Sequence, residues 1–117
     1  MDNNVSIHPY FKVNEGKMDE FKAICEEFIA KTQPEKACLY YGFSFTEDVV
    51  HCREGYVGGE GLLAHIENVG EIIAKALEIS ELVRCEIHGS AEELAKVKGP
   101  LADLGATYYT LECGFRN

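Results

Sequence analysis

Residues 49–61 read Val49-Val50-His51-Cys52-Arg53-Glu54-Gly55-Tyr56-Val57-Gly58-Gly59-Glu60-Gly61, and an apolar-periodic segment follows as far as Leu77. Apolar side chains alternate as far as Tyr56 and then recur about every 3.6 residues, and a glycine-rich joint separates the two patterns. The stretch therefore predicts a strand that leads directly into an amphipathic helix. It places Glu54 and Tyr56 at the end of the strand and His65 in the second turn of the helix.

The segments on either side predict further strands and helices. Alternating apolar residues predict strands at residues 5–13, 37–45, 82–88 and 108–115, and helical spacing predicts a first helix at residues 18–32. Pro9 is expected to cause a bulge or the loss of a ladder hydrogen bond in the first strand. In the fourth strand, Val83, Cys85 and Ile87 are expected to share one face.

A third helix is predicted after the fourth strand. Ser90 and Glu93 have the spacing of a capping box, in which the hydroxyl caps an amide and the carboxylate reaches back. The helix is expected to break at Gly99-Pro100 and to restart as a short turn that Gly105 ends. The complete order is βαββαβ followed by an extra αβ unit.

This order predicts the α+β class, as a ferredoxin-like antiparallel sheet with helices on one face, in a single domain over residues 1–117. Tyr40 and Tyr41 are adjacent, as are Tyr108 and Tyr109, so both faces of the sheet carry bulky side chains. The face without helices is then an aromatic surface of the kind that marks an interface. We therefore expect a symmetric homodimer.

The chain resembles the antibiotic-biosynthesis-monooxygenase-like domains, a family of dimeric α+β barrels. The matching residues are Glu54, Tyr56, Leu63 and His65, with His65 eleven positions after Glu54. Residues 13–21, residues 87–94 and residues 100–105 also fit the family pattern. The resemblance covers nearly the whole chain.

The resemblance implies a small organic ligand in a cavity between the sheet and the helices. It implies a cofactor-independent monooxygenase, with no cofactor and no metal, that removes a proton from a phenolic or enolisable compound before reaction with dioxygen. His65 would be the base, aided by Glu54, and Arg53 or Arg84 would stabilise the oxyanion. The expected catalytic residues are His65, Glu54 and Arg53, and the expected substrate-binding residues are Tyr10, Tyr40, Tyr56 and Arg84.

Each of these residues also has a structural interpretation. A histidine beside a buried helical stripe is often a hydrogen-bonded core residue, and Glu54 could cap or pair with a basic group. Arg53 and Arg84 could form rim salt bridges with Glu54 or Glu86. Tyrosine is also the usual filler of a half-buried sheet.

A non-catalytic ligand-binding or dimerisation module is therefore the alternative function, since the fold alone does not define chemistry. An enzyme of this kind is expected to have a cavity of a few hundred Å³, on which His65 and an arginine converge. A structural module would have that space filled by side chains. A third interpretation, redox sensing, requires Cys52 or Cys113 to be exposed beside a basic group.

Charge and cysteine content exclude several classes of partner and site. Eleven basic and twenty acidic side chains give a net charge of −9, which disfavours nucleic acid and anionic membrane surfaces. Five scattered cysteines without a Cys-x-x-Cys motif, and a start without signal-peptide character, predict a reduced cytoplasmic protein. Most of these thiols are expected to be small core side chains.

The four histidines do not have the spacing of a metal site. His51 and Glu54 lie three apart on a predicted strand and therefore on opposite faces, and no two histidines are four residues apart on a helix. Heme-degrading relatives carry a further histidine on the second helix. Here Lys75 lies in that region and no histidine follows before His88, which argues against heme.

Overall fold

The computed structural model describes residues 2–117 and contains a five-stranded sheet with the order β2-β3-β1-β4-β5. The strands are β1 (Asn4–Val13), β2 (Cys38–Thr46), β3 (Val49–Val57), β4 (Ser80–Gly89) and β5 (Thr107–Thr110). The helices are α1 (Met18–Thr32), α2 (Gly58–Asn68), α3 (Gly70–Glu78) and α4 (Ala91–Lys98), and a 3-10 turn, η1 (Ala102–Leu104), precedes β5. The order confirms the predicted α+β fold.

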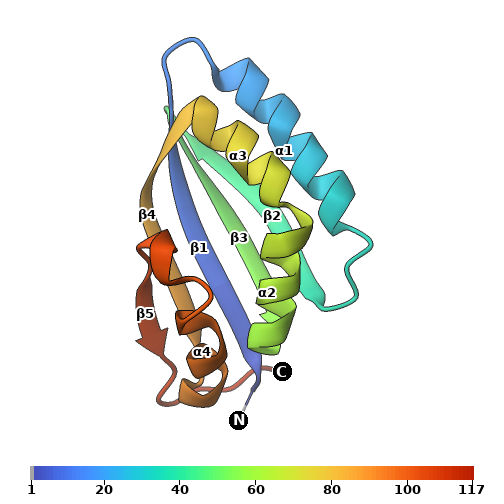
Figure 1. Ribbon diagram of the computed structural model, residues 1–117, viewed down its shortest axis with the longest axis vertical. Coiled ribbons are helices and arrows are strands. Elements are labelled where there is room, and N and C mark those ends of the chain that lie inside the picture. The colour runs from blue at the N-terminus through green and yellow to red at the C-terminus, as the bar shows by residue number, and fades with distance from the viewer. Residues whose placement is uncertain (1) are drawn as a thin grey trace.

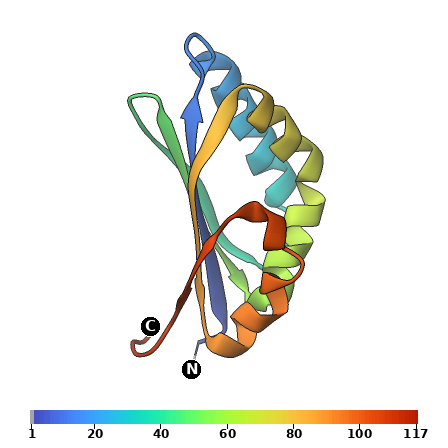
Figure 2. The ribbon, with the colours of Figure 1, turned by 60° about the vertical axis from the view of Figure 1, so that its left-hand side comes forward.

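The helices lie on one side of the sheet and leave the other side bare (Figures 1 and 2). Two groups of buried side chains fill the space between the layers, one around Phe21 and Val50 and the other around Tyr56 and Leu62. We call the helix-covered side of the sheet the inner face and the bare side the outer face. Among residues 2–117, no helix is both long and apolar enough to cross a membrane.

The sheet is mixed, whereas the order of elements in the sequence predicts an antiparallel sheet. β5 pairs with β4 in parallel, because α4 and η1 carry the chain back before β5 begins. The last strand is also shorter than predicted: it ends at Thr110, and residues 111–117 leave the sheet (Figure 2). Phe115, which was expected to end that strand, is 89% exposed.

The predicted second helix is divided at Val69, whose backbone leaves the helical conformation. The buried stripe nevertheless continues across the break, because Val69 itself is 0% exposed. Leu77, expected in the stripe, is 44% exposed instead.

A bulge interrupts the pairing of β1 with β4, one residue beyond Pro9. Tyr10 pairs with Arg84 but Phe11 pairs with Leu82, so Val83 has no partner on β1. The predicted irregularity near Pro9 is confirmed. Val83 was predicted to share a face with Cys85 and Ile87, but the bulge separates it from them: Val83 is 49% exposed, whereas Cys85 and Ile87 are 6% and 0% exposed.

Candidate active site

Glu54 lies near the end of β3 on the inner face of the sheet. Strand alternation turns Cys52, Glu54 and Tyr56 toward the helices, and these residues are 1%, 4% and 0% exposed. A carboxylate that is buried this deeply loses its hydration, which disfavours the charged form. The groups around Glu54 therefore decide whether it carries a proton.

The nearest group to Glu54 is the phenol of Tyr56, whose hydroxyl donates to Oε1 at 2.5 Å. Burial raises the pKa of Glu54 to about 7. Hydrogen bonds from Tyr56 and Cys52 oppose the rise in pKa, and the negative charge of Glu35 adds to it. Glu54 therefore exchanges between acid and carboxylate near neutral pH, as a general acid–base group must.

The start of α2 is held by a side chain from α4. Oε1 of Glu93 accepts a hydrogen bond from the backbone N–H of Gly59 at 2.8 Å, where a helix has amides without partners. Position 59 requires glycine, because a Cβ there would lie 2.7 Å from the carbonyl oxygen of Glu93. This junction fixes the start of α2, the helix that carries His65, against α4.

Of the two hydrogen bonds of the capping box predicted at Ser90, one is present. The Ser90 hydroxyl accepts from the N–H of Glu93 at 3.3 Å, as expected. The Glu93 carboxylate does not bond back to the amide of Ser90; its Oε1 caps α2 at Gly59 instead, and its Oε2 accepts from Lys96 at 3.2 Å.

His65 lies between two carboxyl groups and is 2% exposed. Its Nδ1 is 2.9 Å from Oε2 of Glu35, and its Nε2 is 3.4 Å from Oε1 of Glu54. Burial lowers the pKa of His65, while the hydrogen bond and charge of Glu35 oppose that change. The ring centroid lies 4.9 Å from that of Tyr56 and 5.3 Å from that of Tyr41.

A cavity between the sheet and the helices opens onto Glu54 and His65. The cavity has a volume of about 70 Å³ that a water-sized molecule can occupy. The total space between its walls, including the part open to solvent at the mouth, is about 560 Å³. Among the described residues, the rest of the wall is largely apolar or aromatic: Ile7, Pro9, Phe11, Phe28, Tyr41, Phe43, Cys52, Ile66, Val69, Ile73, Leu77, Leu82, Cys85 and Leu104. Leu77 is exposed, which puts part of the mouth beside α3. The site is therefore a narrow apolar cavity, with the carboxyl group of Glu54 and the imidazole of His65 in its wall.

Four of the residues predicted for the site lie on the outer face instead. Arg53 lies between Cys52 and Glu54 on β3, so strand alternation points it away from the cavity, and its guanidinium lies 4.7 Å from the ring centroid of Tyr40. Arg84 lies 5.8 Å from the ring centroid of Tyr10 and forms an ion pair with Glu86. None of the four lines the cavity. Of the predicted residues, the structure brings together Glu54, Tyr56 and His65.

Sequence reasoning missed two residues at this site. Glu35 lies in the connection between α1 and β2 and has no motif around it, so no sequence signal points to it. Tyr41 was detectable in principle, because alternation along β2 puts Tyr40 and Tyr41 on opposite faces.

The cysteines give no support for redox sensing at Cys52. Cys52 is buried, and burial together with the charge of Glu54 raises the pKa of its thiol. Such a thiol forms little of the reactive thiolate. Cys25 and Cys85 are also buried, whereas Cys113 is exposed in the C-terminal tail.

No protein-family model matches the sequence, and no curated protein does either. Among solved structures, MupZ from Pseudomonas fluorescens is 42% identical, with a TM-score of 0.95 over 99% of this chain and 96% of MupZ. Two more distant structures carry the name "putative antibiotic biosynthesis monooxygenase". The protein from Caulobacter crescentus CB15 is 21% identical, with a TM-score of 0.64 over 74% of this chain and 86% of that one. The protein from Chloroflexus aurantiacus J-10-fl is 17% identical, with a TM-score of 0.63 over 75% of this chain and 93% of that one.

This chain belongs to the antibiotic-biosynthesis-monooxygenase-like family. The match to MupZ extends over nearly its whole length, whereas the two distant structures share the fold over about three quarters of it. The cavity of this chain combines a carboxyl group and an imidazole with apolar walls. Such a pair can take a proton from a bound molecule and return it elsewhere.

Proposed function

We propose that the cavity is an active site in which Glu54 exchanges a proton with a small apolar organic molecule. One observation carries the proposal: a buried carboxyl group, its pKa raised to about 7, faces an apolar cavity with no lysine or arginine among its described lining residues. Buried carboxylates that serve stability are normally paired with a cation. A buried carboxyl group with a perturbed pKa and no lysine or arginine beside it in the cavity is the arrangement expected of a reacting group.

His65 has a supporting role in this proposal. Both of its ring nitrogens are directed at carboxyl groups, at 2.9 Å from Glu35 and 3.4 Å from Glu54. A nitrogen engaged in this way is not free to take a proton from a substrate. We therefore assign proton exchange to Glu54, and His65 acts through it.

The specific reaction we propose is cofactor-independent monooxygenation of a phenolic or enolisable compound. The Glu54 carboxylate takes a proton from an activated CH₂ group, and the carbanion transfers two electrons to dioxygen as a C–O bond forms. Glu54 returns its proton to the resulting peroxide. Loss of the second C–H proton and cleavage of the O–O bond leave a carbonyl group and release water. One dioxygen thus converts CH₂ to C=O and H₂O without a cofactor.

The names of the two distant structures and the dry walls of the cavity support the oxygenation step. Apolar walls strengthen each electrostatic interaction with the reacting groups and exclude competing water. The Glu54 acid that forms on proton abstraction is then a hydrogen-bond donor beside the developing negative charge.

The size of the cavity favours a second candidate, a ligand-binding module without catalysis. At about 70 Å³, the cavity is much smaller than the roughly 300–1,000 Å³ of ordinary ligand sites. A ligand larger than a few water molecules requires side chains at the mouth, such as Leu77, to move outward. In this second function, Glu54 would only bind a polar group of the ligand.

Two measurements on a panel of hydroquinones and anthrones separate these functions. Oxygen uptake, with one oxygen atom from ¹⁸O₂ in the product, is the result expected of the monooxygenase. Incorporation of solvent deuterium into the compound without oxygen uptake would support proton exchange by Glu54 and contradict the oxygenation step. Saturable binding with neither signal would contradict the enzymatic proposal and support the binding module.

We also propose that the outer face binds a second copy of the chain in a symmetric homodimer. The face carries aromatic rings across its strands, including Tyr10, Tyr40 and Tyr109, and Tyr109 is 44% exposed. Aromatic residues concentrated on a sheet face without helices are typical of an interface.

Tyr10→Glu is expected to make the chain monomeric at micromolar concentrations at which the wild type sediments as a dimer. The change puts a charge on the central strand of the outer face, and an unpaired charge buried in an interface is strongly unfavourable. Ala23→Glu is the matched control, because Ala23 is exposed on α1 beside α3, on the helix side of the sheet. A wild-type chain that sediments as a monomer under these conditions contradicts the proposed dimer.

A further inference from the structure

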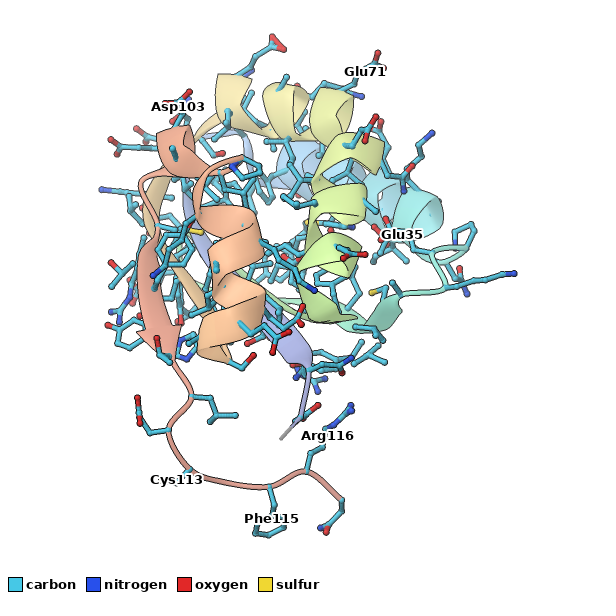
Figure 3. All side chains as sticks on the ribbon, turned by 60° about the horizontal axis from the view of Figure 1, so that its bottom comes forward. Glu35, Glu71, Asp103, Cys113, Phe115 and Arg116 are labelled. Carbon is cyan, nitrogen blue, oxygen red and sulfur yellow. The ribbon has the colours of Figure 1, made fainter. Side chains whose placement is uncertain are left out.

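Glu35 is the residue at this site for which the proposed mechanism supplies no role. It lies between α1 and β2, and Figure 3 shows it beside the end of α1 and next to α2. Its side chain is 14% exposed. One edge of the carboxylate therefore reaches solvent while the other faces His65.

The Glu35 carboxylate is held from two sides. Its Oε2 accepts from Nδ1 of His65 at 2.9 Å and from Nδ2 of Asn68 at 2.7 Å. The Asn68 amide is itself held, because Nδ2 also donates to the carbonyl oxygen of Lys31 at 2.9 Å. The backbone N–H of Glu35 donates to the carbonyl oxygen of Thr32 at 2.8 Å. Glu35 thus presents a fixed acceptor to the imidazole.

This acceptor decides which nitrogen of His65 carries hydrogen. A carboxylate accepts hydrogen bonds and donates none, so the ring must donate from Nδ1. In a neutral ring, Nε2 then carries only a lone pair, and this atom lies 3.4 Å from Oε1 of Glu54. Nε2 can therefore accept from the acid form of Glu54 but cannot donate to its carboxylate.

We propose that Glu35 is a positioning residue that keeps the hydrogen of His65 on Nδ1, and thereby fixes Nε2 as the acceptor for the acid form of Glu54. The opposite tautomer would donate to the carboxylate and favour the charged form of Glu54. The inference rests on the proposed function only for its effect on turnover, since the tautomer is a property of the folded chain.

The other titratable groups near Glu54 and His65 do not take over this function. They are Cys38, Tyr41, Cys52, Tyr56 and Cys85. Burial raises the pKa of each of these groups, so all five stay neutral at physiological pH. Glu35 is the group whose hydrogen bond to His65 selects a tautomer.

Two variants separate the charge of Glu35 from its hydrogen-bonding oxygen. Glu35→Gln removes the charge, but its amide oxygen can still accept from both His65 and Asn68. Glu35→Leu removes the charge and the acceptor together. Differences between these two variants therefore report the acceptor alone.

Ring ¹⁵N chemical shifts of His65 give the tautomer directly. We expect Nδ1–H in the wild type and in Glu35→Gln, and a large fraction of Nε2–H in Glu35→Leu. The titration midpoint of the Glu54 carboxyl carbon is expected to fall by about one pH unit in Glu35→Leu relative to Glu35→Gln. Where a substrate is turned over, the pH dependence of kcat/KM should move by the same amount, and Glu35→Asp should restore it.

Nε2–H in the wild type, or identical tautomers in Glu35→Gln and Glu35→Leu, would overturn the inference. The wild-type spectrum decides the matter even if Glu35→Leu does not fold. A failure of this inference can be told apart from a failure of the proposed function. A chain without turnover can still show the Nδ1–H tautomer, and an active enzyme that loses turnover in Glu54→Gln can still lack it.

Discussion

Glu54→Gln is expected to lower kcat by roughly 10²–10⁴-fold, the range typical of a lost general acid–base group. Glutamine keeps the shape of the side chain and can still accept from the Tyr56 hydroxyl, but it cannot exchange a proton. KM is expected to change little, because the volume of the cavity is unchanged. Steady-state kinetics on a substrate from the hydroquinone and anthrone panel measure both constants.

The matched control for this loss is Glu81→Gln. Glu81 lies on β4, is exposed and does not line the cavity, so the variant removes the same charge away from the site. It is expected to keep the wild-type kcat. A Glu54→Gln variant that also keeps the wild-type kcat contradicts the proposed role of Glu54.

The same substitution is expected to change how stability depends on pH. Burial raises the pKa of Glu54 from 4.5 to about 7. This difference corresponds to about 3 kcal/mol of folding free energy. The free energy of unfolding of Glu54→Gln minus that of the wild type should therefore rise by about this amount between pH 4 and pH 8.5, which urea unfolding at a series of pH values measures.

The direction of this change in stability follows from the number of protons that Glu54 binds in the folded and unfolded chains. Between about pH 4.5 and pH 7, the unfolded chain ionises Glu54 while the folded chain keeps it protonated. Wild-type stability from this group is therefore complete below pH 4.5 and is lost as the pH rises through about 7. Glutamine does not titrate, so the variant does not lose stability in this way as the pH rises. A constant difference between variant and wild type at all pH values would contradict a buried carboxyl group that titrates near neutrality.

Local sequence patterns predicted most of the fold, because hydrophobic period and turn residues act over short distances. The strand–helix joint at residues 56–59 and the break at Gly99-Pro100 are of this kind. The parallel pairing of β5, by contrast, depends on how α4 and η1 return the chain, which no local pattern reveals. The prediction that Val83 shares a face with Cys85 and Ile87 failed for a similar reason, since one extra residue in a bulge breaks the alternation of side chains along the strand.

The site was predictable to the extent that one strand and one helix form it. The spacing of Glu54, Tyr56 and His65 across the joint brought these three residues together without further knowledge of the fold. Arg53 shows the limit of such spacing, because its neighbour Glu54 faces the cavity and strict alternation then excludes Arg53. Glu35 was beyond sequence reasoning, since its contact with His65 joins residues thirty positions apart through a loop of irregular conformation.

The proposed function depends on a Glu54 carboxyl group that is protonated about half the time near neutral pH. The most direct test is a ¹³C NMR titration of protein labelled at the glutamate side-chain carboxyl carbon, with the Glu54 signal assigned by its absence in Glu54→Gln. We expect a midpoint at about pH 7. A midpoint near the ordinary glutamate value of 4.5 would mean that Glu54 is a permanent carboxylate at neutral pH, which contradicts its proposed role in proton exchange.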